Sequence, residues 1–293
     1  MEKINIAKDS TILVTGRNSQ LGETFYEKMK SFKNVHFFDR NTLDITSQNN
    51  IDVLFKQFRP DIVINTAAYT NVDGAEDDRE QSYLINAKSL DYLSNSCARY
   101  QALLIHFSTD YVFDGEKKVP YIESDNTNPI NYYGETKLLG EKNITRSRCR
   151  FLIFRISWLY SKYGKNFHKT ISQLICEKDH LDVVNDQIGV PTSADFIVSN
   201  IKELIINSQF TEKNCNQIYH LSPHGCASWY EFAVNINNYQ NISCNIKPTT
   251  SDSYFTKARR PKHSKLSADK FISTFGVDIK NWEFYHKELI TKS

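Results

Sequence analysis

Short apolar runs alternate with longer amphipathic stretches through the first half of the chain. The runs are apolar enough to be strands buried on both faces, and they lie at residues 11–15, 35–39, 61–65, 103–108 and 151–155. The stretches between them predict helices at residues 20–32, 51–58, 80–100 and 131–142. Apolar strands that alternate with helices are typical of a parallel sheet covered on both faces. The pattern therefore predicts an α/β fold with a doubly wound parallel sheet.

The pattern loosens after Trp158, where loops rich in Asn, Ser and Pro separate the elements. Three helices and one strand are predicted beyond this point, at residues 167–176, 193–206, 228–237 and 217–221. Ser228 is the expected N-cap of the helix that it begins. We therefore expect a main domain over residues 1–158 and a smaller C-terminal region over residues 159–293. A strand or helix of this second region is a candidate to return to the main sheet.

Composition narrows the class of protein. A chain of 293 residues with 40% hydrophobic residues can bury a substantial core. Its formal net charge of +2, without long basic runs, argues against nucleic acid as a partner. The 6 cysteines are scattered and form no C-x-x-C pair, which argues against zinc and suits a reducing compartment. With no signal peptide and no long apolar segment, we expect a cytoplasmic protein without a membrane partner.

A glycine-containing loop, Thr-Gly-Arg-Asn-Ser-Gln-Leu-Gly, joins the first strand to the first helix. Such a turn brings backbone N–H groups and a helix N-terminus close to the pyrophosphate of a dinucleotide. The usual spacing has glycine at 16, 19 and 22, but position 19 is Ser. Three outcomes are open for Ser19: the loop tolerates its Cβ, its hydroxyl donates a useful hydrogen bond, or the affinity for the cofactor falls. We predict a Rossmann-type dinucleotide-binding domain over residues 1–158, with pyrophosphate contacts at Gly16, Ser19, Gln20, Leu21 and Gly22.

The second strand ends at Asp39, where a carboxylate can bind the adenosine ribose of NAD. Arg40 follows it and Arg17 lies in the glycine loop, and either can pair with the 2′-phosphate of NADP. Asp39 and Arg40 also suit an ordinary turn. The expected cofactor is therefore NADPH or NADH, and Asp44 and Ile45 are further candidate cofactor-binding residues.

Tyr133 and Lys137 are four residues apart in the predicted helix at 131–142, so they share one helix face. The positive charge of Lys137 is expected to lower the pKa of Tyr133 from its usual value of about 10. A tyrosine tuned in this way can protonate the alkoxide that forms when a carbonyl is reduced. Downstream of a nicotinamide site, the pair predicts a carbonyl reductase. Without that context, the pair also fits an ordinary helix in which the tyrosine ring is packed and the lysine is solvated.

Together these motifs closely resemble those of the dTDP-4-dehydrorhamnose reductases, which are extended short-chain dehydrogenases. The resemblance covers nearly the whole chain. It rests on NTAAYTNVD (65–73), STDYVFDG (108–115), YYGETKLLGE (132–141), RISW (155–158), NF (166–167), DQIGVPT (186–192), WYEFA (229–233) and RRPKHS (259–264).

The resemblance implies reduction of the C4 ketone of dTDP-4-dehydro-L-rhamnose to dTDP-L-rhamnose, a precursor of surface polysaccharide such as O-antigen. It implies that Tyr133 donates the proton to the C4 oxygen and that Lys137 holds the nicotinamide ribose. Thr109 would hydrogen-bond the same oxygen, although a hydroxyl at a strand end can also simply cap the backbone. Further cofactor contacts are implied just beyond the third strand, at Ala67, Ala68, Tyr69 and Thr70.

The same resemblance implies that residues 159–293 are mainly a substrate-binding region. It places Val72, Thr109, Asp110, Tyr111 and Trp158 in the sugar pocket. An aromatic face suits the C–H face of a pyranose, although a Trp just after a strand is more often buried. Arginine binds phosphate oxygens in a bidentate manner, which makes Arg260 and its neighbour Arg259 candidates for the nucleotide diphosphate.

Some members of the family bind a divalent metal such as Mg²⁺ at a dimer interface. A homodimer is therefore expected, but we map no metal ligand onto this sequence. Two alternatives remain. A reductase of another nucleotide-linked 4-keto-6-deoxy sugar would keep the same catalytic residues and differ in its pocket. A non-catalytic, cofactor-binding regulatory subunit would account for Ser19, but it would not need to keep Thr109, Tyr133 and Lys137.

Overall fold

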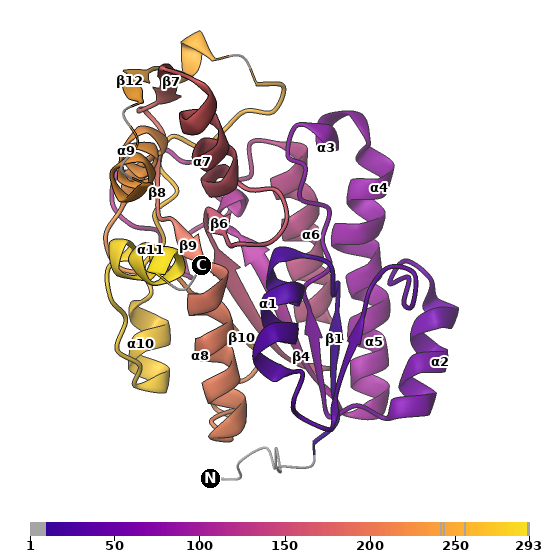
Figure 1. Ribbon diagram of the computed structural model, residues 1–293. Helices are drawn as coiled ribbons and strands as arrows, with labels where there is room; N and C mark the ends of the chain where they lie inside the picture. Colours follow the sequence, from indigo (N-terminus) through magenta and orange to yellow (C-terminus); the bar gives the residue numbers. More distant parts are fainter. Residues whose placement is uncertain (1–9, 241, 243, 255, 292–293) are drawn as a thin grey trace.

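A parallel sheet forms the centre of the molecule in the computed structural model, which describes residues 10–240, 242, 244–254 and 256–291. Within this part of the chain, six strands pair in the order β10-β5-β4-β3-β1-β2 (Figure 1). They are β1 (Ile12–Thr15), β2 (Val35–Phe38), β3 (Ile62–Asn65), β4 (Leu103–Thr109), β5 (Arg150–Ile156) and β10 (Gln217–His220). The predicted α/β fold with a doubly wound parallel sheet is confirmed.

Helices cover both faces of this sheet, because successive side chains of each strand point to opposite faces. Val14 and Ile64 pack on one side in a core cluster with α1 (Gln20–Met29) and α8 (Ala194–Ile206). Leu13 and Val63 pack on the other side in a second cluster. The helices of that side are α2 (Gln48–Phe58), α5 (Ser89–Tyr100) and α6 (Tyr132–Arg146). Burying each such aliphatic side chain contributes roughly 1.5–3 kcal/mol, so the strands are fixed from both sides.

The predicted helix at residues 80–100 is interrupted. It consists of α4 (Arg79–Tyr83), a π-helical turn η1 (Leu84–Lys88) and α5, and the short helix α3 (Gly74–Asp77) precedes it. A π turn holds one extra residue, which redirects the side chains within it. Here the amide of Asn86 reaches the loop after β3, where it accepts a hydrogen bond from Tyr69 N at 2.9 Å and donates one to Tyr69 O at 3.0 Å.

The second half of the chain adds two-stranded sheets that the sequence pattern did not reveal, because most of the strands described in them are only two residues long. Their pairs are β6 (Leu159–Tyr160) with β9 (Thr192–Ser193), β7 (His180–Val184) with β12 (Asn245–Thr249), and β8 (Ile188–Gly189) with β11 (Ala227–Ser228). The remaining elements are α7 (Phe167–Glu177), α9 (Trp229–Gln240), α10 (Asp269–Phe275), α11 (Trp282–Thr291) and the 3₁₀ turns η2 (Asp110–Val112) and η3 (Ser251–Ser253). In Figure 1 the elements β7, β12, α7 and α9 lie together at the upper left.

Ser228 caps α9 as predicted. Its hydroxyl accepts a hydrogen bond from Glu231 N at 3.0 Å, and the Glu231 carboxylate accepts one from Ser228 N at 2.7 Å. This reciprocal pair is a capping box, which satisfies two helix-end donors at once. None of the helices in the described part of the chain is both long enough and apolar enough to cross a bilayer.

Candidate active site

The glycine loop makes a turn that needs its glycines. Gly16 has a φ of +71°, and a Cβ at this position would lie 2.6 Å from Ala67 N. A Cβ on Gly22 would lie 2.1 Å from Gly16 O. Both positions are therefore closed to any side chain, and the start of α1 lies tightly against the ends of β1 and β3.

Ser19 is the N-cap of α1. Its hydroxyl accepts a hydrogen bond from Gly22 N at 3.0 Å and lies 2.9 Å from the hydroxyl of Thr66. Thr66 donates its own proton to Thr15 O at 2.6 Å, so the single proton of Ser19 goes to Thr66. The Ser19 side chain therefore joins α1 to β1 and β3.

The cap leaves an anion site at the start of α1. The first amides of a helix have no partner within the helix, and a helix N-terminus attracts anions. Since Gly22 N is bonded to the cap, the amides of Gln20 and Leu21 are those that can face a pyrophosphate. The side chain of Gln20 points elsewhere, because its Oε1 accepts hydrogen bonds from Ser161 Oγ and Asn166 Nδ2, both at 2.9 Å.

Asp39 follows β2 and forms a turn with its own carboxylate. The carboxylate accepts hydrogen bonds from Asn41 N and Thr42 N, both at 3.0 Å, and from Thr42 Oγ1 at 2.9 Å. The bonds from Thr42 are the largest cause that lowers the pKa of Asp39. A negative charge is therefore fixed at the carboxyl end of β2, where the sequence predicts a ribose or 2′-phosphate contact.

The two arginines near this end differ. Arg17 pairs with Glu23 at 2.5 Å and lies 3.8 Å from the centre of the Tyr26 ring, whereas Arg40 is exposed. Of the other two candidates, Asp44 accepts hydrogen bonds from the backbone N–H and the hydroxyl of Thr46 at 2.9 and 2.7 Å. The side chain of Ile45 is buried in the core cluster beneath α2.

The loop after β3 brings the next group of predicted cofactor residues to the same edge of the sheet. Ala67 and Ala68 are partly buried and carry little side chain, while Thr70 is exposed. The side-chain amide of Asn86 holds the backbone of Tyr69 by hydrogen bonds to both its N–H and its C=O. Asn86 was not predicted, because a π turn leaves no distinct mark on the helical pattern.

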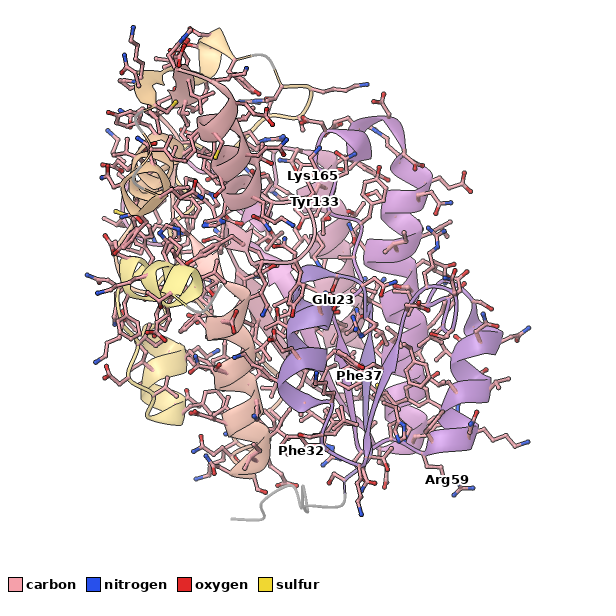
Figure 2. All side chains as sticks on the ribbon, viewed as in Figure 1. Glu23, Phe32, Phe37, Arg59, Tyr133 and Lys165 are labelled. Atoms are coloured by element: carbon pink, nitrogen blue, oxygen red, sulfur yellow. The ribbon has the colours of Figure 1, made fainter. Side chains whose placement is uncertain are left out.

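Thr109 and Tyr133 meet at the carboxyl end of β4, and Figure 2 shows Tyr133 near the upper end of α6. Thr109 Oγ1 accepts a hydrogen bond from Tyr111 N at 3.2 Å. Burial raises the pKa of Tyr133 to about 12, and a hydrogen bond with Thr109 opposes this rise. The expectation that Lys137 lowers the pKa of Tyr133 below its usual value is therefore wrong, because the desolvation of the phenolate is the larger effect.

Lys137 lies one helical turn further on and is fully buried, with 2% of its surface exposed. Its amine donates a hydrogen bond to Phe107 O at 2.7 Å and lies 3.2 Å from His106 Nε2. Burial lowers the pKa of Lys137 to about 8, and the charge of Glu141 opposes this change. His106 was not predicted, although a polar residue inside the apolar run of β4 was the signal for it.

Asp110 and Tyr111 lie beside Tyr133. Asp110 is buried, which raises its pKa to about 7, while hydrogen bonds from Ser264 and Thr109 oppose the rise. The Tyr111 ring packs edge-on against the Tyr133 ring, with 5.7 Å between their centres. The structure thus places two of the predicted sugar-pocket residues next to the predicted proton donor.

Arg260 connects the last loop of the chain to this site. Its guanidinium donates to the Asp73 carboxylate at 2.7 Å, just after the partly buried Val72. Burial raises the pKa of Tyr111, and the positive charge of Arg260 opposes the rise, so these two side chains are close. Arg259 is exposed.

Trp158 forms a separate aromatic group. Its φ is +45°, which is uncommon for a bulky residue, and its ring stacks on Trp229 with 3.5 Å between centres and 5° between planes. A Cβ on Gly189 would lie 2.4 Å from the Trp158 ring. Trp158 is half-buried. Trp229 belongs to the motif at 229–233, but no role was predicted for it.

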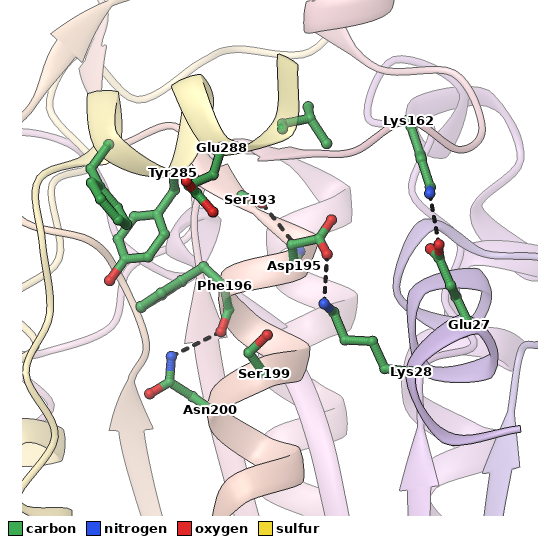
Figure 3. A pocket seen from close by; sticks show the side chains of 12 residues that line it. Glu27, Lys28, Lys162, Ser193, Asp195, Phe196, Ser199, Asn200, Tyr285 and Glu288 are labelled. Carbon is green, nitrogen blue, oxygen red and sulfur yellow. Dashed lines mark hydrogen bonds and ion pairs between the residues drawn. The ribbon is translucent and has the colours of Figure 1, made fainter. Parts of the chain in front are cut away.

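A cavity of about 370 Å³ lies away from these residues, between α1, α8 and α11 (Figure 3). Ion pairs cross it from Lys28 to Asp195 and from Lys162 to Glu27, both at 2.8 Å. None of the predicted site residues, all of which the structure describes, lines it. Among the described residues, no group of three or more His, Cys, Asp or Glu side chains is arranged to hold a metal ion.

The parallel sheet, the glycine turn and the Thr109, Tyr133 and Lys137 group define the class as an extended short-chain dehydrogenase with a Rossmann-type fold. Residues 10–293 match the model of the family described as RmlD substrate binding domain. The chain belongs to this family.

Similar proteins span nearly the whole length of the chain. The dTDP-4-dehydrorhamnose reductase of Escherichia coli K12 is 34% identical, with 96% of this chain and 97% of that protein covered. The Sinorhizobium fredii reductase of the same name is 36% identical, with 95% and 96% covered. The solved structure of the Bacillus anthracis dTDP-4-dehydrorhamnose reductase in complex with NADP is 34% identical. It has a TM-score of 0.92 and covers 97% of this chain and 100% of that chain.

Proposed function

We propose that this protein reduces the C4 ketone of dTDP-4-dehydro-L-rhamnose to dTDP-L-rhamnose, with NADPH as the reductant. The observation that carries the proposal is the meeting of Thr109 and Tyr133 at the carboxyl end of β4, with Lys137 one turn further along α6. Ligands of doubly wound sheets bind at this edge. The names of the full-length relatives and the NADP in the Bacillus anthracis structure support the same reaction.

The residues at the edge of the sheet fit a nicotinamide dinucleotide. Gly16 and Gly22 allow the tight turn, and the amides of Gln20 and Leu21 are available for the pyrophosphate. Ala67 and Ala68 leave room for the nicotinamide half beyond β3. When bound, the cofactor supplies the hydride.

The side chains of this chain handle the proton and the orientation of the ketone. With a pKa of about 12, the Tyr133 phenol keeps its proton at neutral pH and can donate it to the C4 oxygen. The Thr109 hydroxyl holds the same oxygen in line. Lys137, with a pKa of about 8, is mostly protonated at neutral pH and stabilises the phenolate that remains.

The preference for NADPH rests on the adenosine end of the site. The exposed Arg40 can pair with a 2′-phosphate, while Arg17 is already engaged with Glu23. The carboxylate of Asp39 is engaged by Asn41 and Thr42, so a ribose contact there has to compete with the turn. An Arg40→Met variant is expected to raise the KM for NADPH and leave that for NADH unchanged.

The sugar nucleotide is expected to lie between the sheet edge and residues 159–293. Asp110 and Tyr111 flank Tyr133, and Val72 lies beside the Asp73–Arg260 pair. The stacked Trp158–Trp229 pair offers an apolar surface for the pyranose, and Arg260 offers donors for the diphosphate. In this proposal, residues 1–158 bind the cofactor and residues 159–293 mainly bind the substrate.

A homodimer and a Mg²⁺ ion at its interface stay predictions. Sedimentation in the presence of Mg²⁺ and of EDTA checks both, because a metal-dependent dimer dissociates on chelation.

The decisive experiment follows the oxidation of NADPH and NADH with a panel of dTDP-, UDP- and GDP-linked 4-keto-6-deoxy sugars. We expect the highest kcat/KM for NADPH with dTDP-4-dehydro-L-rhamnose. A higher value with another sugar nucleotide would assign the protein to that substrate. Cofactor binding without oxidation of any member would favour a regulatory subunit.

A further inference from the structure

A row of buried polar groups leads across the sheet to Lys137, and the proposed mechanism uses only this last member. Thr15 Oγ1 donates to Asn65 Oδ1 at 2.6 Å, Asn65 Nδ2 lies 3.1 Å from His106 Nδ1, and His106 Nε2 lies 3.2 Å from Lys137 Nζ. These four side chains are each at most 2% exposed. The row crosses β1, β3 and β4 and ends on α6.

The direction of each hydrogen bond follows from Asn65. Its Oδ1 also accepts a hydrogen bond from Ala67 N at 3.3 Å, and a backbone N–H can only donate. The amide nitrogen of Asn65 therefore faces His106 and donates to Nδ1. A neutral imidazole has one proton, which must then be on Nε2, facing Lys137. Since this N–H donates, the Lys137 amine accepts, and only a neutral amine can accept.

A protonated Lys137 requires the opposite arrangement. An ammonium group is only a donor, so His106 Nε2 must accept and the ring proton must lie on Nδ1. Asn65 must then turn its oxygen toward the ring and lose the bonds from Ala67 N and from Thr15 Oγ1, although the Thr15 hydroxyl can turn to accept from the amide nitrogen instead. Passing from the first arrangement to the second adds one proton to Lys137, moves the ring proton from Nε2 to Nδ1 and reverses one amide.

We propose that Asn65 and His106 are positioning residues that link the protonation of Lys137 to the loop after β3. The Ala67 N–H selects the orientation of the Asn65 amide, the amide selects the tautomer of His106, and the tautomer selects the neutral Lys137. A ligand that shifts the Ala67 backbone weakens this selection and brings the proton to Lys137. The link to catalysis rests on the proposed function, in which Ala67 adjoins the cofactor and Lys137 assists Tyr133.

The other charged groups near Lys137 do not provide such a link. On α6 itself they are Tyr133 and Glu141, and the Glu141 carboxylate binds Arg155 of β5 at 2.9 and 2.7 Å. The turn η2 contributes Asp110, which lies by Tyr133, and η1 packs on α6 through uncharged residues such as Asn86. Burial also lowers the pKa of His106 well below its usual range, which keeps the ring neutral in both arrangements.

The first test reads the tautomer directly and needs no enzyme activity. Long-range ¹H–¹⁵N spectra of the ¹⁵N-labelled protein distinguish Nδ1–H from Nε2–H, and His106→Gln or His106→Asn identifies the signals of this ring. We expect Nε2–H at pH 9 and Nδ1–H at pH 7 in the wild type. In Asn65→Asp the carboxylate can only accept, so Nδ1–H is expected at both pH values. One unchanged tautomer in the wild type across this range, or Nε2–H in Asn65→Asp at pH 9, would overturn the proposal.

The second test measures kcat/KM for NADPH-dependent reduction between pH 6 and 10. Asn65→Asp is expected to move the ionisation near pH 8 upward by at least one unit. Asn214→Asp is the matched control, because Asn214 is also buried but lies before β10 and donates to Gln209 O at 2.8 Å. An equal shift of this ionisation in both variants would mean that the added negative charge alone causes it, and it would refute the link from Asn65 to Lys137. If no sugar is reduced, the proposed function fails. The NMR measurement of the His106 tautomer still tests the proposed link between Asn65 and Lys137, because it does not depend on activity.

Discussion

The Thr109–Tyr133 pair and the Trp158–Trp229 stack are held in different ways. Thr109 ends β4 and Tyr133 lies in the first turn of α6, so backbone hydrogen bonds of long elements fix both positions. Trp158 has a left-handed backbone conformation, and its ring is held by stacking on Trp229 and by the space that Gly189 leaves. The strands around it are only two residues long. The comparison predicts that changes at the sheet edge affect the chemical step, while changes around Trp158 affect binding of the sugar nucleotide.

Tyr133→Phe should give the largest effect. Without the phenolic proton, kcat is expected to fall by about 10²–10⁴-fold, the usual range for removing a general acid. Binding of NADPH, measured by fluorescence titration, should stay close to that of the wild type. Tyr132→Phe is the matched control, because its ring stacks with Arg79 on the outside of the same helix turn and should retain turnover. Substantial turnover in Tyr133→Phe would exclude it as the proton donor.

Lys137→Met should lower kcat and weaken NADPH binding, and it also has a signature in stability. Folding lowers the pKa of Lys137 from 10.5 to about 8, so between these values the unfolded chain holds a proton that the folded protein lacks. The free energy of unfolding of the wild type should therefore rise with pH across this window. The stability is present above pH 10.5 and is lost as the pH falls toward 8.

Denaturant unfolding at pH 8, 9 and 10 measures this signature. Lys137→Met should lack the rise, whereas Lys142→Met, an exposed lysine of the same helix, should keep it. A rise of equal size in Lys137→Met would mean that another group causes it.

Gly189→Ala tests the other side of the comparison. The added Cβ would lie 2.4 Å from the Trp158 ring, so the ring must move. We expect the KM for the sugar nucleotide to rise by about tenfold, equivalent to about 1.4 kcal/mol, with the KM for NADPH unchanged. Measuring both KM values on one preparation distinguishes a local displacement of the Trp158 ring from a general loss of folded structure. A rise in both would mean that the two regions are not independent.

Ser19 should give the smallest effect. Because its hydroxyl bonds Gly22 N and Thr66, Ser19→Ala is expected to lose about 1 kcal/mol of stability and Ser19→Gly a few tenths of that. Neither should change the Kd of NADPH by more than about threefold. Calorimetric unfolding and NADPH titration of both variants check this. Tighter binding in Ser19→Gly alone would show that the Cβ crowds the pyrophosphate after all.

Much of the fold followed from local patterns. The apolar runs placed the strands of the main sheet within a residue or two, because these runs stand out from the polar and amphipathic stretches on either side of them. The helix at 80–100 was only partly predicted, since the π turn at Leu84–Lys88 depends on packing against α6. The small sheets formed by β6 to β9, β11 and β12 escaped prediction because β6, β8, β9 and β11 have only two residues each, while β7 is partly and β12 largely exposed.

The sequence by itself determined the chemical groups of this protein: a glycine turn after a buried strand, and a tyrosine and a lysine on one helix face. Such features are local, because they depend on spacing within a single element. Only the tertiary structure decided what surrounds those groups. Burial reversed the expected change in the pKa of Tyr133, and contacts between β3, β4 and α6 joined Asn65 and His106 to Lys137. Desolvation and hydrogen-bond direction depend on residues far apart in the chain, and these meet only when the sheet forms.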